Sequence, residues 1–220
     1  MNRFTLPAVA ALVVLAPTPP AGATEEPDYA VVAGEGSFEL RQYPAMLAAE
    51  TVVRDSTFDD AGNVAFGRLF RYITGNNRAQ ADIAMTAPVV QSRERASDRP
   101  GEKIAMTAPV IQQAAPDGEP GSGYRVAFLV PAGYTRETVP EPLDPLVQIV
   151  VMPARLVAAI RYSGRTSAEL NDRKEQALRS WMATRQLLAT GDAISAQYNA
   201  PFIPGPFRRN EVLIPVTRSE

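Results

Sequence analysis

Residues 38–73 read FELRQYPAMLAAETVVRDSTFDDAGNVAFGRLFRYI and contain the pattern that decides the fold. Apolar and polar residues alternate over residues 38–43, as in a half-buried strand, and a second strand-like run covers residues 46–53. From Asn63 onward the apolar residues follow helical spacing. The segment therefore predicts two strands followed by an amphipathic helix that is capped at Thr57.

The same succession of elements returns 109 residues later in the chain. Residues 147–152 and 156–162 predict two more strands, and a second helix with an apolar stripe follows them. Thr57 opens a T-x-x-D cap before the first helix, and Thr166 opens a T-x-x-E cap before the second. This offset indicates one strand–strand–helix–strand unit used twice; chance similarity between short Ala-rich strands is the alternative.

Two further strands complete the expected domain. Residues 124–130 have the composition of a strand, and residues 211–216 supply a last strand that can close the sheet. We therefore predict an α+β fold: a distorted open β-barrel or curved, largely antiparallel sheet with two helices packed on it. The two pseudo-symmetric repeats cover about residues 29–130 and 146–217.

The composition excludes several kinds of chemistry. The 220 residues include neither Cys nor His, which rules out disulfides, thiolate nucleophiles, imidazole bases and the usual zinc ligands. The 22 basic and 24 acidic residues give a net charge of −2, so nucleic acid is not an expected partner. A hydrophobic share of 45% suits one domain with its own core.

Residues 1–23 have the features of a secretory signal peptide. A short positive start precedes an apolar run of 11 residues, 6–16, and Ala21-Gly22-Ala23 forms an A-x-A cleavage site. A membrane anchor is the alternative, but it needs about 20 apolar residues. We therefore expect an exported, periplasmic or secreted protein whose single domain covers residues 24–220, with no integral membrane segment after cleavage.

Between the two units a heptapeptide occurs twice without change. Residues 83–89 and residues 104–110 both read IAMTAPV. The segment between them is polar and rich in turn-forming residues, so the simplest geometry is a hairpin that places the two copies side by side. Because proline lacks an N–H, each strand is expected to bend or end near Pro88 and Pro109.

With this paired motif, the sequence resembles the SOUL haem-binding protein family, as an exported, bacterial-type member. The resemblance covers nearly all of the chain after residue 23. It rests on FELRQY at 38–43, GNN at 75–77, both heptapeptides, YRVAF at 124–128 and PFRRNEV at 206–212. The resemblance implies a distorted barrel with two helices that binds haem or another tetrapyrrole non-covalently in a hydrophobic cleft beside the first helix.

The resemblance also implies which residues form that cleft, with basic side chains near the propionates. Carried onto this sequence, they are Asn63, Phe66, Phe70 and Arg71 of the first helix, with Arg208 or Arg209 of the last strand nearby. Arg68 lies one turn before Arg71 and is a further candidate for a propionate, since guanidinium groups bind carboxylates through two parallel hydrogen bonds. The helical spacing of the two phenylalanines also suits core positions.

An iron atom would have few ligands to choose from in this chain. Without His and Cys, the remaining haem-iron ligands are Met sulfur and Tyr oxygen. Met85 and Met106 in the heptapeptides and Tyr72 on the first helix are weak axial candidates, and a Met at such a position also suits core filling. We therefore expect a macrocycle held mainly by apolar contact, with no assigned metal ligand.

Three functions are consistent with these observations. The leading expectation is non-enzymatic binding of haem or a related tetrapyrrole for transport, buffering or scavenging. The missing His supports an alternative, a protein-interaction module of the same fold that has lost tetrapyrrole binding. The third is an enzyme that uses Tyr and carboxylates, which rests on fold-level analogy alone.

Overall fold

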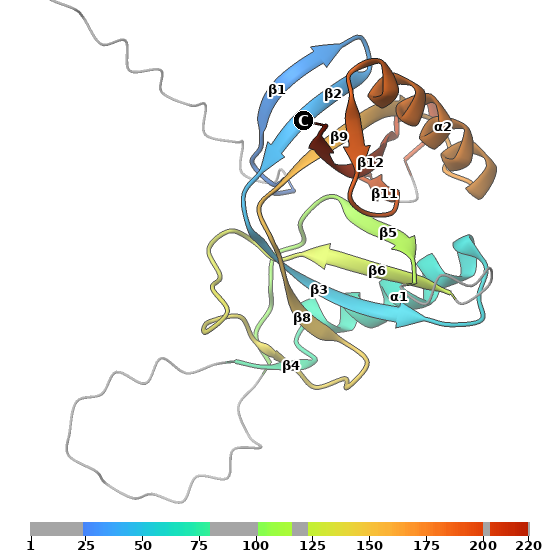
Figure 1. Ribbon diagram of the computed structural model, residues 1–220. Coiled ribbons are helices and arrows are strands. Elements are labelled where there is room, and N and C mark those ends of the chain that lie inside the picture. Colours follow the sequence, from blue (N-terminus) through green and yellow to red (C-terminus); the bar gives the residue numbers. More distant parts are fainter. Residues whose placement is uncertain (1–23, 80–100, 116–122, 200–202, 220) are drawn as a thin grey trace, which may run out of the picture.

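The computed structural model describes residues 24–79, 101–115, 123–199 and 203–219. Two helices, α1 (Phe58–Ile73) and α2 (Ala168–Thr184), pack on a large antiparallel sheet, which confirms the predicted α+β class (Figure 1). The predicted signal peptide and the first heptapeptide lie outside the described residues. The strands are β1 (Ala30–Glu35), β2 (Phe38–Tyr43), β3 (Met46–Val53), β4 (Asn77–Arg78), β5 (Val110–Ala114), β6 (Tyr124–Leu129), β7 (Glu141–Pro142), β8 (Gln148–Met152), β9 (Arg155–Ser163), β10 (Leu187–Ala189), β11 (Ile194–Gln197) and β12 (Arg209–Arg218), with a 3₁₀ helix, η1 (Gly205–Phe207), before β12.

The main sheet has ten strands and is open. Its order is β1-β2-β9-β12-β11-β5-β6-β3-β8, and β10 pairs with β12; β4 and β7 form a separate two-stranded sheet. Within the described residues β1 and β8 do not pair with each other, so the sheet is not a closed barrel. The elements β3-α1 and β9-α2 follow one another in the predicted order, while the internal repeat and its pseudo-symmetry stay a prediction.

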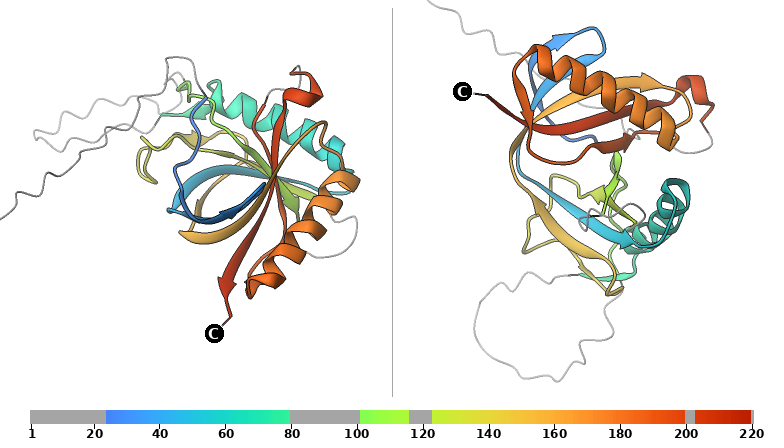
Figure 2. Two further views of the ribbon diagram at one scale, coloured as in Figure 1. Left: turned by 90° about the horizontal axis from the view of Figure 1, so that it is seen from above. Right: turned by 45° about the vertical axis from the view of Figure 1, so that its right-hand side comes forward.

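Alternate residues of the central strands enter different cores. In β9, Ala158 and Ile160 join the core under α2, whereas Val157 and Ala159 join a core that contains no helix residue. This alternation is expected because successive side chains of a strand point to opposite faces of a sheet. We call the face turned away from both helices the inner face. Figure 2 shows the two helices on separate parts of the other face.

The helix caps confirm one prediction and correct another. The Thr57 side chain accepts a hydrogen bond from the Asp60 backbone N–H, as predicted for α1. The cap of α2 is Ser167 rather than Thr166, since the Ser167 hydroxyl accepts a hydrogen bond from the Leu170 backbone N–H at 3.2 Å. Serine and threonine can both cap a helix. The helix begins after the residue whose hydroxyl accepts a hydrogen bond from a backbone N–H of the first turn, which in α2 is Ser167.

The second heptapeptide forms less strand than the hairpin prediction required. Residues 101–109 are irregular apart from an isolated bridge between Thr107 and Glu25, and β5 begins at Val110, directly after Pro109. A proline at this position cannot donate a ladder hydrogen bond, which fits a strand start better than a strand interior. The predicted pairing of the two copies involves the first copy, which lies outside the described residues.

Candidate functional site

Helix α1 is fixed to the sheet by one apolar stripe. Its buried residues are Ala61, Ala65, Leu69, Tyr72 and Ile73. They follow helical spacing and pack with residues of β3 and β6, including Ala49 and Phe128. The opposite side of the helix therefore faces away from the sheet.

Exposed apolar side chains and an exposed arginine lie on this helix outside its buried stripe. We call Asn63, Val64, Phe66, Phe70 and Arg71 the α1 flank. Phe66 is half-buried with its ring edge-on to Phe128 at 5.3 Å, and it stacks on Phe70 at 5.8 Å between centroids. Phe70 is 41% exposed and Val64 50% exposed. The flank thus presents a supported aromatic ring to solvent, and Asn63 and Arg71 of the same helix are also exposed.

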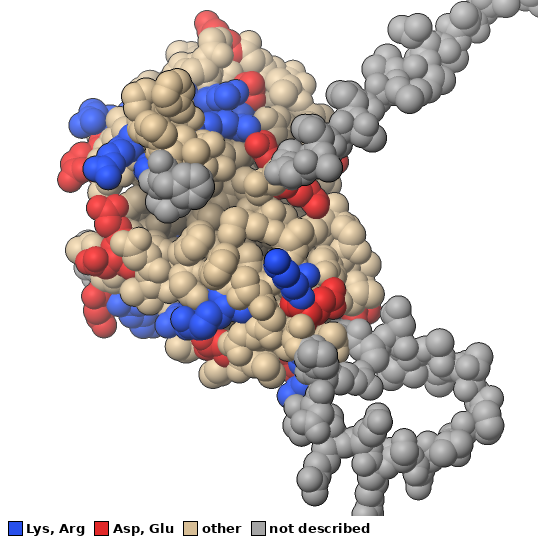
Figure 3. Space-filling model, turned by 180° about the vertical axis from the view of Figure 1, so that it is seen from behind, with Lys and Arg blue, Asp and Glu red and all other residues tan. Residues whose placement is uncertain are grey.

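The surface around this helix carries few charges at its centre. Helix α1 lies at the back of the view in Figure 1, so Figure 3 shows its side of the molecule. Uncharged side chains cover much of the middle of that face, and charged side chains lie mostly toward its rim (Figure 3). A flat apolar ligand on this side would displace little hydration from charged groups.

Arg68 does not join the α1 flank. Its Nη1 donates to the Thr51 hydroxyl of β3 at 2.6 Å, and its Nε lies 3.8 Å from the Asp144 carboxylate. At about 100° per residue, Arg68 projects from the opposite edge of the helix to Phe70. The prediction that Arg68 contacts a propionate beside Phe70 is corrected accordingly: this side chain ties α1 to β3 and to the loop before β8.

Tyr72 is not available as an axial ligand. Its side chain is 1% exposed and its hydroxyl donates to the Pro140 carbonyl at 2.8 Å. Burial, with the charges of Tyr134 and Glu102 adding to it, raises the pKa of the Tyr72 phenol well above its ordinary value, so the phenolate form is strongly disfavoured. The physical reason for this correction is that position 72 belongs to the buried stripe of α1.

The sulfur candidates give little more support for iron ligation. Met106 is 41% exposed, and Met85 lies outside the described residues. Within the described ranges no group of three or more His, Cys, Asp or Glu residues could hold a metal ion. The residues of the α1 flank fit a tetrapyrrole whose ring contacts apolar side chains and whose propionate carboxylate pairs with an arginine guanidinium. They do not fit one held by a strong bond to the metal.

Arg208 and Arg209 are engaged away from the α1 flank. Arg208 Nε donates to the Ile203 carbonyl at 2.7 Å. Arg209 pairs with Glu26 at 2.8 Å and with Glu211 at 3.2 Å, and its guanidinium lies 3.7 Å above the centre of the Tyr198 ring. The predicted role of Arg209 beside the first helix is therefore replaced by a role in a network on the inner face.

That network contains a fully buried ion pair between β2 and β12. Arg41 is 2% exposed and Glu211 0% exposed, and two Arg41 nitrogens donate to the two Glu211 oxygens at 2.6 and 3.1 Å. The Tyr198 hydroxyl donates to the same carboxylate at 2.8 Å. Burial raises the pKa of the Glu211 carboxyl, but the hydrogen bond and charge of Arg41, with Tyr198 and Arg209, outweigh it and hold the pKa below its ordinary value.

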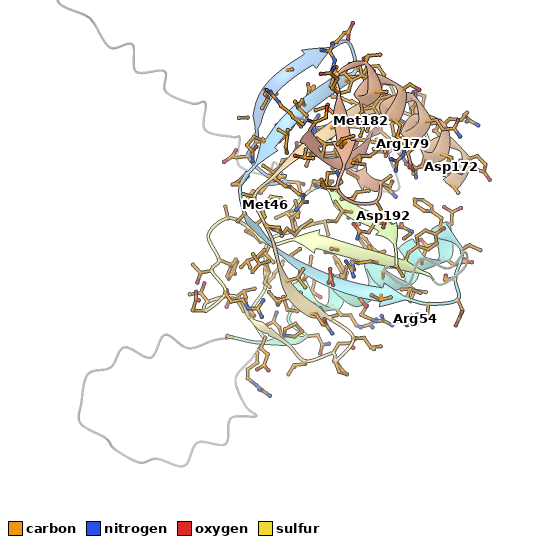
Figure 4. The ribbon with its side chains drawn as sticks, in the orientation of Figure 1. Met46, Arg54, Asp172, Arg179, Met182 and Asp192 are labelled. Carbon is orange, nitrogen blue, oxygen red and sulfur yellow. The ribbon has the colours of Figure 1, made fainter. Side chains whose placement is uncertain are left out.

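The inner face also carries two hollows and a small space that shares lining residues with both; we call them together the inner-face groove, with two lobes and a waist. The first lobe, about 910 Å³, lies between the segment 24–28 and residues 129–136, and the second, about 500 Å³, lies among β3, β5, β6 and β8. The waist is a space of about 20 Å³. Met46 lines both the waist and the first lobe, and Met152 and Arg155 line both the waist and the second lobe. Figure 4 labels Met46 and, in the loop before β11, Asp192, which lines the second lobe.

The fold defines the chain as an α+β protein with one open antiparallel sheet and two helices. The sequence profile described as SOUL heme-binding protein matches residues 24–100 and 95–215. The chain therefore belongs to the SOUL haem-binding protein family, as the motifs indicated.

Individual relatives are more distant. Heme-binding protein 1 of Xenopus tropicalis is 39% identical over 54 residues, which are 24% of this chain and 28% of that protein. The match thus spans just over a quarter of the relative's length. In the described part of this chain, no helix combines the length and the apolar character needed to span a bilayer.

Solved structures share the fold at low identity. The C-terminal domain of EcmrR has a TM-score of 0.53 and 10% identity, over 83% of this chain and 98% of that domain. EcmrR in a complex with DNA has a TM-score of 0.55 and 10% identity, over 83% of this chain and 57% of that protein. A hydrolase from Listeria innocua has a TM-score of 0.51 and 12% identity, over 84% and 94% of the two chains. At these identities the likeness concerns the fold alone.

Proposed function

We propose that this chain is a non-enzymatic protein that binds haem or a related tetrapyrrole non-covalently for transport, buffering or scavenging. The observation that carries the proposal is the α1 flank of a SOUL-family chain, where the exposed Phe70 ring, supported by Phe66, and the exposed Arg71 follow one another on the helix. Bound haem would supply a redox-active iron, while the protein supplies a surface for one face of the ring and a cation for its edge.

The expected affinity follows from the kind of contact. Covering about 300 Å² of apolar porphyrin surface at about 25 cal/mol/Å² stabilises the complex by roughly 7 kcal/mol before association costs are subtracted. Arg71 makes no ion pair with any described residue, so its guanidinium is available for a propionate. An affinity no tighter than the micromolar range follows, because no strong metal–ligand bond adds to these contacts.

Export is part of the proposal. It is supported by the A-x-A site at residues 21–23 and by the family match, which begins at residue 24. The protein recovered from an exported fraction should therefore begin at Thr24. A protein that retains residues 1–23 would contradict cleavage at that site.

Titration of the protein with hemin and with metal-free protoporphyrin IX tests the function. We expect saturable changes in the Soret band and in Trp181 fluorescence at micromolar concentrations, with the two affinities within about threefold of each other, because apolar contact dominates. No saturable change at tens of micromolar would contradict the proposal. It would favour the second candidate, an interaction module without pigment, which the buried position of Tyr72 and the absence of His support.

Replacing Arg71 with Ala tests the edge of the site. The variant should bind hemin about threefold to tenfold more weakly, because one partly exposed charge-assisted contact is lost. Arg179→Ala on α2 is the matched control, since it also removes an exposed helix arginine, in this case one paired with Glu175. Equal affinities of the two variants would remove Arg71 from the site.

A further inference from the structure

The waist of the inner-face groove contains a guanidinium that has no anionic partner among the residues the structure describes. Arg155, the first residue of β9, lines the waist and the second lobe, and no carboxylate of the described residues lies within 4.0 Å of it. Its Nη1 reaches the Pro153 carbonyl only at 3.5 Å and its Nη2 the Met152 sulfur only at 4.0 Å. Its Nε is buried and has no hydrogen-bond partner.

Such an environment is unusual for a cation. Buried polar groups are normally hydrogen-bonded, and buried charges are normally paired. Burial also lowers the pKa of the Arg155 guanidinium, although an arginine stays protonated in proteins. A ligand that brings an anionic group to Arg155 would supply the partner that the described residues do not provide.

Among the cations that line the groove, Arg155 has the least compensation from neighbouring groups. Arg125 also lines the second lobe, but its Nε lies 3.6 Å from Glu50, which offsets its charge. Asp192 lines the same lobe from an exposed loop. Arg136 lines the first lobe, but it is exposed and donates to a backbone carbonyl at 2.7 Å. Among the described cations of the groove, Arg155 therefore combines partial burial with the absence of a neighbouring carboxylate.

The shape of the groove selects the rest of the ligand. The walls beside Arg155 are apolar and include Met46, Ile111, Leu129, Met152 and Ile194. The waist of about 20 Å³ leaves no room for a rigid macrocycle to extend from one lobe into the other. A thin, flexible chain with one anionic end fits this geometry, because its head can bind at the waist while its tail lies along one lobe.

We propose that the inner-face groove binds a long-chain carboxylate, with the carboxylate on Arg155 and the apolar chain along the adjoining lobe. This site goes beyond the tetrapyrrole function, because it lies on the opposite face of the sheet from the α1 flank and uses other residues. The two sites therefore make separate predictions.

Calorimetric titration with laurate tests the site, with dodecylammonium as a probe of the same chain length and opposite charge. Laurate should bind saturably and dodecylammonium at least about tenfold more weakly. Arg155→Met should weaken laurate binding roughly tenfold to hundredfold, as expected for losing charge-assisted hydrogen bonds. Arg161→Met is the matched control, since Arg161 lies on the same strand, is exposed and lines none of the three spaces.

Two further measurements distinguish a carboxylate site at Arg155 from loss of folding and from binding at the α1 flank. Arg155→Met should keep or raise the melting temperature, because removing an unpaired, half-buried charge does not break a native ion pair. A lower melting temperature would show that the variant loses laurate binding through unfolding rather than through loss of the guanidinium. Saturation with hemin should leave laurate affinity unchanged. Equal binding of laurate and dodecylammonium, unchanged laurate affinity in Arg155→Met, or competition between laurate and hemin would each overturn the proposal.

Discussion

Glu211→Gln is expected to lower the free energy of unfolding by about 3–5 kcal/mol, because it removes the fully buried counter-charge of the Arg41 guanidinium. Arg41 is 2% exposed, and its remaining carboxylate partner, Glu39 at 2.6 Å, is a residue of its own strand. The substitution therefore removes the ion pair that joins β2 to β12. Urea denaturation followed by circular dichroism measures the change.

Two control variants separate this effect from a general loss of charge. Glu175→Gln removes the carboxylate of an exposed i,i+4 pair on α2 and should change the free energy of unfolding by no more than about 0.5 kcal/mol. The double variant Arg41→Met, Glu211→Leu should recover part of the loss, since apolar replacement of a buried pair is often neutral or stabilising. A loss below about 1 kcal/mol in Glu211→Gln would contradict the role assigned to the pair.

The same carboxylate gives the stability of the protein a defined pH dependence. The pKa of Glu211 is lowered in the folded state, so the ionised form contributes stability that is fully present above the pKa of the unfolded chain. That contribution is lost as the pH falls below the ordinary glutamate pKa of 4.5 towards the folded value. In Glu211→Gln the free energy of unfolding should therefore fall less steeply as the pH is lowered below 4.5. An unchanged slope would show that another carboxyl group causes the pH dependence.

The sequence predicted the elements whose patterns are strong. The strands at 38–43 and 46–53 have the predicted bounds, because alternation or an apolar run covers their whole length. It did not predict β1, whose residues are almost all exposed, nor β11, which has only four residues. Neither segment shows a pattern long enough to separate a strand from a loop.

The candidate site was harder to predict than the fold, because helical spacing does not fix which way a flank faces. Arg68 and Arg71 are one turn apart in sequence, yet one pairs with β3 and the other is exposed. The buried pair of Arg41 and Glu211 gave a weak signal in the sequence: opposite charges within two predicted strands, with Glu211 the first residue of the second. The uncompensated charge of Arg155 gave no signal in the sequence, since only the structure shows that its Nε is buried without a hydrogen-bond partner and that no described carboxylate pairs with it.

Adjacent residues of α1 should separate stability from binding. Leu69 is 0% exposed in the core under the helix, so Leu69→Ala should lower the free energy of unfolding by about 2–5 kcal/mol through lost burial and a cavity. Phe70 is 41% exposed, so Phe70→Ala should cost less than about 1 kcal/mol of stability. The second substitution removes the ring that the α1 flank presents to solvent.

The binding measurement on the same two variants decides whether the α1 flank is the tetrapyrrole site. Phe70→Ala should weaken hemin binding about tenfold, because the stacking surface is lost while the helix stays in place. Leu69→Ala, measured where it remains folded, should bind hemin within about threefold of the unaltered protein, since its side chain faces the core. If Phe70→Ala bound hemin as tightly as the unaltered protein, the tetrapyrrole would have to contact another surface, even if the family function itself holds.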